Sequence, residues 1–155
     1  MKNIEKYQAT GYGYFAIQST KPQTIGYGLN DSPVGLAAWI IEKFHGWTKD
    51  NSDKLVVSLD EVLAIVSLYW HTESITSSAR FYYENGPLGF TFNLVSQPMA
   101  GAIFENEIAR PPRVWAEKIY NIVQWNQYPG GHFAALESPK ILAEDIFSFV
   151  AKLEI

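Results

Sequence analysis

Hydrophobic positions in the first half of the chain recur at helical spacing, and in the second half helical and extended patterns alternate. Leu36, Ile40 and Phe44 follow one another at four-residue intervals, which places them on one face of a helix. Ser32-Pro33 just before them combines a capping side chain with a proline suited to the first helical turn. The predicted helix is apolar on most of its circumference, so we expect it to be buried.

Two more helices follow in the first half. Ser58 and Glu61 have the spacing of a capping box, in which each side chain satisfies the other's free backbone N–H. The helix that they open carries one apolar stripe, made of Leu59, Val62, Leu63, Val66, Tyr69 and Trp70. The next helix is predicted from about Ser74 to Glu84 and should stop at Asn85-Gly86-Pro87, where a left-handed residue precedes a proline.

The N-terminal segment is predicted to be less regular. Residues 2–8 resemble the end of a helix that Gly11 and Gly13 break. Tyr14–Gln18 is expected to be short and extended. Pro22 then begins a brief helix over about 23–29, because its missing N–H is not needed in a first turn.

The second half is predicted to run strand, helix, strand, helix. Residues 90–103 indicate a strand with an irregular loop, 113–120 a helix, and the apolar run 122–125 a buried strand. A final helix over 139–153 has its apolar stripe at Leu142, Ile146, Phe149 and Leu153. Two strands do not make a stable sheet alone, so these strands need further strands or a packed layer.

Composition narrows the class of protein. The 155 residues are 47% apolar and 18% charged, which is typical of a globular domain. A net charge of -4 and the absence of any basic face make nucleic acid an unexpected partner. The chain has no cysteine, which excludes disulfides and thiolate chemistry. With no apolar run near 20 residues and no signal-peptide core, the chain as given is expected to be cytoplasmic.

His132 is the histidine best placed for chemistry. It follows Gly130-Gly131, whose glycines permit a tight turn, and Tyr128-Pro129 rules out helix just upstream. A strand, a Gly-Gly-His loop and a closing helix are how the α/β-hydrolase fold delivers its catalytic base. We therefore expect an α/β fold in which His132 is a general base.

A catalytic imidazole needs a carboxylate to hold its tautomer and stabilise the imidazolium that forms. Glu107 is the best-placed candidate, because it follows the earlier strand as His132 follows the later one, and neighbouring strand ends can meet at one edge. Glu105 is a rival that the spacing alone does not exclude. An ordinary surface loop of carboxylates is about as good an explanation.

Two tyrosines are candidates for proton donors. Tyr82 shares a helix face with Ile75 and Ala79, and Tyr14 lies in the aromatic stretch near the N-terminus. A phenol in an apolar cavity donates a hydrogen bond without carrying charge, which suits an oxygen that becomes an alkoxide. Taken singly, each tyrosine is more simply explained as a core residue.

The other histidines indicate no further site. His45, before Gly46-Trp47, and His71, after Tyr69-Trp70, are interpreted as helix-end residues. The three histidines lie far apart, without metal-ligand spacing, so we expect neither a metal nor another cofactor.

Five motifs stand at 13–24, 29–44, Tyr69-Trp70, 77–82 and 130–137, spread over nearly the whole chain. In order and spacing they closely resemble the C-terminal part of microsomal-type epoxide hydrolases, a group that includes the insect juvenile hormone epoxide hydrolases. The resemblance implies a partial α/β-hydrolase fold with a helical lid over 1–89 and a core segment over 90–155. This segment would hold the last two strands and helices of the core sheet, without the sheet's N-terminal half.

The resemblance also implies roles. In this family an aspartate opens the epoxide to an alkyl ester, and a histidine with its acidic partner activates water to release a diol. Carried over by position, the base is His132, the acid is Glu107 and not Glu105, and the lid tyrosines are Tyr14 and Tyr82. No aspartate of this chain follows a strand in a tight elbow, whether Asp31, Asp50, Asp53, Asp60 or Asp145. The nucleophile is therefore expected from a missing N-terminal portion.

The sequence thus predicts an epoxide hydrolase acting on a small apolar epoxide and water, with the missing half or a partner chain completing the sheet. The isolated 155 residues should be inactive and should tend to self-associate through open strand edges. One alternative is a non-catalytic binding or assembly module derived from an epoxide hydrolase. Another is a dehalogenase of the same fold, which the tyrosine pair disfavours.

Overall fold

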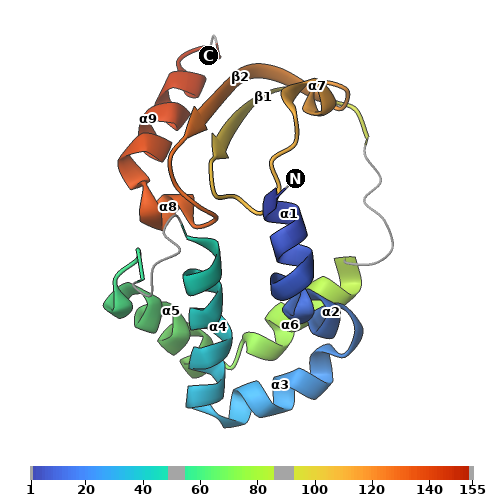
Figure 1. Ribbon diagram of the computed structural model, residues 1–155, viewed down its shortest axis with the longest axis vertical. Coiled ribbons are helices and arrows are strands. Elements are labelled where there is room, and N and C mark those ends of the chain that lie inside the picture. Colours follow the sequence, from blue (N-terminus) through green and yellow to red (C-terminus); the bar gives the residue numbers. More distant parts are fainter. Residues whose placement is uncertain (1, 49–54, 86–92, 154–155) are drawn as a thin grey trace. The chain divides into compact units, whose positions relative to one another are not determined.

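The computed structural model describes residues 2–48, 55–85 and 93–153. The chain divides into two compact units (Figure 1): Met1–Gly46 with Ser52–Phe90, and Trp47–Asn51 with Thr91–Ile155. We call these the first unit and the second unit. The polar segment 49–54, the helix stop at Gly86-Pro87 and the predicted strand start at Phe90 lie outside the described residues.

The first unit is helical. Its elements are α1 (Lys2–Lys6), the π-helix η1 (Tyr7–Gly11), α2 (Gly13–Thr20), α3 (Pro22–Asp31), α4 (Pro33–Trp47, whose last residue groups with the second unit), α5 (Leu59–His71) and α6 (Ile75–Asn85). Its core gathers Leu29, Leu36, Val66 and Ile75 from four of these helices. No helix in the described part of the chain is long and apolar enough to span a bilayer.

The predicted helix starts of the first unit are confirmed. Ser58 and Glu61 form the complete capping box at the start of α5. Pro22 and Pro33 stand at the first positions of α3 and α4, and Ser32 Oγ accepts a hydrogen bond from Gly35 N at 3.0 Å. These local signals succeed because each depends on residues within one turn.

One prediction for the N-terminal segment is confirmed and one is wrong. The expected break lies at the glycines, since η1 ends at Gly11 and α2 begins at Gly13. Tyr14–Gln18, however, is helical, as part of α2. The aromatic stretch suits a strand by propensity, but its rings pack on α6: Tyr14 and Phe15 each lie 5.7 Å from the ring of Tyr82. Buried Gln18 also accepts a hydrogen bond from Trp39 Nε1 at 3.2 Å, which fixes α2 to α4. Tertiary contacts thus override the local preference.

The predicted burial of α4 and α5 is only partly correct. Leu36, Phe44, Val62 and Val66 are buried, whereas Leu59 on α5 is 53% exposed and Val34 on α4 is 77% exposed. The buried stripe on each of these two helices is therefore narrower than the apolar pattern in the sequence indicates.

The second unit contains a two-stranded parallel sheet. Its elements are β1 (Val95–Phe104), α7 (Arg113–Ala116), β2 (Tyr120–Tyr128), α8 (Ala134–Glu137) and α9 (Pro139–Val150), and Figure 1 shows β1 and β2 side by side. The register pairs Phe104 with Tyr128, so both strands end at one edge. The predicted helix over 113–120 is too long: it ends at Ala116, because Ile119 O accepts from Val95 N and starts the strand pairing.

A buried polar network joins α9 to β2. Gln124, Asn126 and Tyr128 alternate along β2 and therefore share one face. Asn126 Nδ2 and the Tyr128 hydroxyl each donate to Asp145 Oδ1 at 2.6 Å, and Gln124 Nε2 donates to the Asp145 carbonyl at 2.9 Å. Asp145 is the buried residue of α9, whereas Ile146, predicted on its buried stripe, is 50% exposed. The apolar stripe predicted for this helix is therefore wrong at Ile146.

The network predicts an acid-sensitive step in stability. Burial by itself would raise the pKa of Asp145, but the hydrogen bonds from Tyr128 and Asn126 lower it below its ordinary value. The carboxylate therefore stabilises the fold above about pH 4, and this contribution is lost as the pH falls through the folded-state pKa. We expect Asp145→Asn to lower the free energy of unfolding at pH 7 by about 2 kcal/mol, measured by urea denaturation.

The matched control is Glu144→Gln at the exposed neighbouring position. It should leave the free energy of unfolding within about 0.5 kcal/mol of the wild type. In Asp145→Asn the loss of stability between pH 5 and 3 should be smaller than in the wild type. An equally steep loss in both proteins would show that the network does not contribute as described.

Candidate active site

The loops after β1 and β2 are tied together at the edge where both strands end. Glu105 N donates to Tyr128 O at 3.0 Å, and Asn106 N donates to Gly130 O at 2.9 Å. These bonds extend the parallel pairing beyond the strands. Glu107, three residues after β1, and His132, four residues after β2, are thereby placed on adjacent loops.

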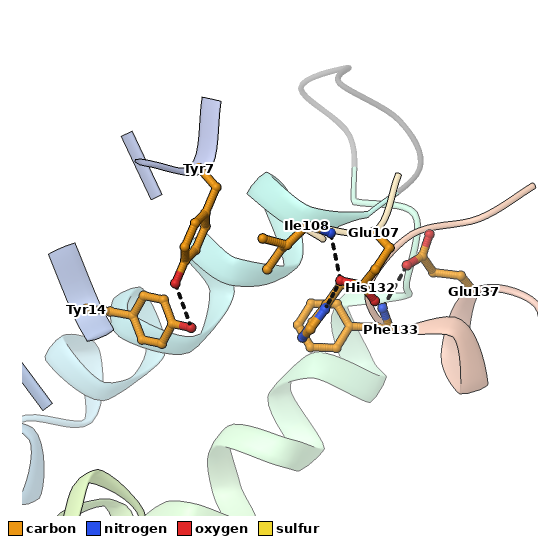
Figure 2. Close-up of polar contacts among 7 residues, drawn as sticks. All are labelled: Tyr7, Tyr14, Glu107, Ile108, His132, Phe133 and Glu137. Atoms are coloured by element: carbon orange, nitrogen blue, oxygen red, sulfur yellow. Dashed lines mark hydrogen bonds and ion pairs between the residues drawn. The ribbon is translucent and has the colours of Figure 1, made fainter. Parts of the chain in front are cut away.

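The two glycines before His132 serve different purposes. Gly130 has φ +142°, in the region that favours glycine, as the sequence predicted. Gly131 is required for space: a Cβ there would lie 2.5 Å from Trp47 O and 2.8 Å from Glu137 Oε1. Glu137 Oε1 accepts from Phe133 N at 3.0 Å, which closes the turn (Figure 2). The loop geometry is therefore set by close backbone packing on both sides of the histidine.

The structure brings Glu107 and His132 together. His132 Nδ1 lies 2.7 Å from Glu107 Oε1, and Ile108 N donates to the same oxygen at 2.7 Å (Figure 2). Burial would raise the pKa of Glu107, but the hydrogen bond with His132, the electrostatic interaction with the same imidazole and the Ile108 N–H together lower it. Glu107 is thus a carboxylate at neutral pH. Glu105, the rival in the sequence, lies two residues earlier and is exposed.

Trp47 is a site residue that the sequence did not indicate. Its carbonyl accepts from His132 N at 2.9 Å, and its ring lies 5.1 Å from the imidazole at 74°. The ring of Phe133 also meets the imidazole edge to face, with its centroid 5.1 Å from that of His132. The sequence indicated only a helix end at His45-Gly46, just before Trp47. Its partner lies 85 positions further along the chain, and no local pattern reports such a contact. The imidazole side chain remains 38% exposed, so water can reach it.

In the first unit the structure brings Tyr14 and Tyr82 together. Their rings meet edge to face, with centroids 5.7 Å apart at 81°. Tyr14 also receives a hydrogen bond from the Tyr7 hydroxyl at 3.3 Å (Figure 2), and Lys43 Nζ lies 4.6 Å from its ring centroid. Burial, followed by the Tyr7 hydrogen bond and the nearby Tyr82 phenol, raises the pKa of Tyr14 far above its ordinary value. Tyr14 is therefore a neutral donor at any physiological pH.

A pocket of about 760 Å³ borders Tyr82 between the end of α5 and α6. Leu68, Tyr69 and Phe81 provide apolar walls, and Thr72, Ser74 and Ser77 add hydroxyls. Within the described residues there is no group of three acidic, histidine or cysteine side chains that could hold a metal ion. The described residues thus bring together an imidazole–carboxylate pair in the second unit and a pair of phenols in the first unit.

Comparison with known proteins places this chain in a family. No family model matches it. Epoxide hydrolase 1 of Sus scrofa is 45% identical over 156 residues, which cover 92% of this chain and 34% of that protein. Juvenile hormone epoxide hydrolase 1 of Ctenocephalides felis is 44% identical, with the same coverage. The chain belongs to the epoxide hydrolase family. It corresponds to the C-terminal part of these proteins and spans about a third of the length of the curated relatives that it matches.

Solved structures of epoxide hydrolases establish the fold. The juvenile hormone epoxide hydrolase of Bombyx mori matches with a TM-score of 0.88 at 31% identity, covering 97% of this chain and 39% of that one. The Aspergillus niger epoxide hydrolase matches with a TM-score of 0.84 at 35% identity and covers 97% of this chain and 38% of that one. The chain therefore has a partial α/β-hydrolase fold, as the sequence predicted.

Proposed function

We propose that this chain is part of an epoxide hydrolase that opens a small apolar epoxide to a vicinal diol through an ester intermediate. Epoxide hydrolases from several organisms at 36–45% identity support the reaction class. The observation that carries the proposal is the 2.7 Å contact between His132 Nδ1 and Glu107 Oε1 on an imidazole that water can reach. The attacking carboxylate is assigned to a part of the enzyme outside these 155 residues.

In the first step, the tyrosine pair serves the epoxide oxygen. A carboxylate forms a bond to one epoxide carbon, the carbon–oxygen bond breaks, and the released oxygen needs a proton. Tyr14 and Tyr82 are assigned as hydrogen-bond donors to that oxygen. The raised pKa of Tyr14 supports this role, because the group keeps its proton until negative charge develops beside it.

In the second step, the imidazole–carboxylate pair serves the ester. Glu107 engages Nδ1 of His132, which leaves Nε2 to take a proton from water. The resulting hydroxide adds to the ester carbonyl, and the bond from that carbon to the diol oxygen breaks. The departing oxygen takes the proton held on the imidazolium, and the carboxylic acid that remains loses its own proton to become the carboxylate again. Glu107 stabilises the imidazolium that forms meanwhile, and its own lowered pKa keeps it ionised for this purpose.

The apolar pocket beside Tyr82 supports a hydrophobic substrate. Its volume of about 760 Å³ falls within the range of small-molecule sites. The aromatic and aliphatic walls would bind a hydrocarbon portion by its apolar surface, and the neighbouring hydroxyls would tolerate a polar substituent. An apolar epoxide such as styrene oxide is therefore a suitable probe.

We further propose that the rest of the fold covers apolar side chains that are exposed here. In the second unit, Trp115 on α7 is 63% exposed and Phe147 on α9 is 73% exposed. The two-stranded sheet also needs further strands for stability. Both features suit a segment that forms part of a larger sheet. On this proposal, residues 1–89 form the helical lid and residues 90–155 form the C-terminal segment of the α/β-hydrolase core.

The proposal is tested by diol formation from styrene oxide with the complete product of the open reading frame that encodes this chain. Glu107→Gln should lower kcat at least about a hundredfold at pH 7, because the amide neither holds the imidazole tautomer nor stabilises its charge. Glu105→Gln, at the exposed glutamate two positions earlier, is the matched control and should stay within about twofold of the wild type.

Equal activity of Glu107→Gln and wild type would overturn the assignment of the acid. Absence of any diol from the wild-type product would overturn the proposed function, and release of chloride from a chloroalkane without diol formation would point to a dehalogenase.

A further inference from the structure

Tyr7 is a third phenol at the tyrosine pair. Its hydroxyl donates a hydrogen bond to the Tyr14 hydroxyl at 3.3 Å, and the two rings meet edge to face with centroids 6.5 Å apart at 70° (Figure 2). Tyr7 is the first residue of η1, and π-helical turns are rare and frequently found at functional sites. Neither the sequence patterns nor the resemblance assigned this residue a role.

We propose that Tyr7 is a positioning residue for Tyr14, which directs the Tyr14 proton toward the epoxide oxygen. This inference rests on the proposed function. A phenol oxygen accepts and donates, so donation from Tyr7 occupies the accepting side of Tyr14 and leaves its single hydrogen for another acceptor. Tyr82 is a second hydrogen-bond partner of Tyr14. Tyr7 thereby turns the Tyr14 O–H away from itself, toward the side that remains for an acceptor.

The ring of Tyr14 is held independently of its hydroxyl. Lys43 Nζ lies 4.6 Å from the ring centroid, and the ring of Tyr82 packs against it at 5.7 Å. The side chain of Lys43 is only 13% exposed, so its ammonium is a fixed neighbour of the ring. These contacts restrain the phenol's plane and leave the direction of the O–H to its hydrogen-bond partner.

The same hydrogen bond has a role during ring opening. As the epoxide carbon–oxygen bond breaks, Tyr14 gives its proton to the leaving oxygen and retains the electron pair as a phenolate. The Tyr7 O–H already points at that oxygen and stabilises the charge, since linked hydrogen bonds strengthen one another. Hydrolysis of the ester by water then yields the diol, the free carboxylate and one proton, and that proton restores Tyr14.

The test is Tyr7→Phe in the complete gene product, with ester formation and ester hydrolysis measured separately in single-turnover experiments. Loss of one neutral hydrogen bond should slow ester formation about fivefold and leave ester hydrolysis within about twofold. A general structural defect would slow both steps. The urea midpoint should be unchanged, because phenylalanine keeps the ring contacts.

A double-mutant cycle tests whether Tyr7 acts through Tyr14. In a Tyr14→Phe background, Tyr7→Phe should have no further effect on ester formation, because the oxygen that it serves is gone. Tyr12→Phe is the matched control: its ring lies 6.0 Å from that of Tyr7, it is 43% exposed, and the variant should behave as wild type.

Three outcomes would overturn the role of Tyr7 but not the proposed function, provided that the wild type makes diol. They are equal slowing of both steps, an unchanged rate of ester formation, and a full fivefold effect in the Tyr14→Phe background. A wild-type product without diol formation would overturn the proposed function, and with it the role of Tyr7. The two failures are thus distinguishable.

Discussion

Replacement of His132 by glutamine should lower kcat for diol formation about a thousandfold or more in the complete gene product. Glutamine fills similar space and can still bond to Glu107, but it cannot take a proton from water. The carboxylate at 2.7 Å from Nδ1 would then have no imidazolium to stabilise. Steady-state diol formation from styrene oxide, measured by chromatography, checks this prediction.

His71 offers a matched control within the same chain. It is the last residue of α5 in the first unit, and His71→Gln should leave kcat within about twofold of the wild type. If His132→Gln retained a tenth or more of the wild-type kcat, His132 would not be the base.

The double variant Tyr14→Phe/Tyr82→Phe should slow ester formation about a thousandfold, with each single variant slowed about tenfold to a hundredfold. Phenylalanine keeps the edge-to-face ring contact at 5.7 Å, so the substitution removes both hydroxyl donors while preserving the packing. Without a donor the epoxide oxygen must leave as an unsolvated alkoxide. Single-turnover kinetics with a small excess of enzyme over styrene oxide measure this step directly.

Tyr83→Phe is the control for the tyrosine variants. Tyr83 is adjacent to Tyr82 on α6 but points about 100° away, and it is 57% exposed. The variant should form the ester at the wild-type rate. A double variant that formed the ester within tenfold of the wild-type rate would remove both tyrosines from the chemistry.

Local signals in the sequence predicted helix starts and the histidine loop well. The Ser58–Glu61 capping box, the prolines that open α3 and α4, and the positive φ of Gly130 each depend on a few adjacent residues. The chain order of strand, acid, strand and histidine was enough to predict that Glu107 and His132 could meet at one sheet edge, because parallel strands end together.

Long-range contacts explain what the sequence did not reveal. The helical state of Tyr14–Gln18 depends on rings from α6 and on Trp39, and these partners lie dozens of residues away. The same holds for Trp47 beside His132. Periodicity also predicted an apolar stripe on α9, but Asp145 is buried on this helix. The side chains on β2 that donate hydrogen bonds to Asp145 cannot be inferred from the sequence of the helix itself.

The most direct test of the account is detection of the covalent intermediate by rapid quenching and mass spectrometry of the intact complete protein after mixing with styrene oxide. If Tyr14 and Tyr82 serve ester formation and His132 serves ester hydrolysis, His132→Gln should accumulate about one adduct per protein and Tyr14→Phe/Tyr82→Phe should show none on the same timescale. An adduct that accumulates in the tyrosine variant, or none in His132→Gln although the wild type makes diol, would contradict the account.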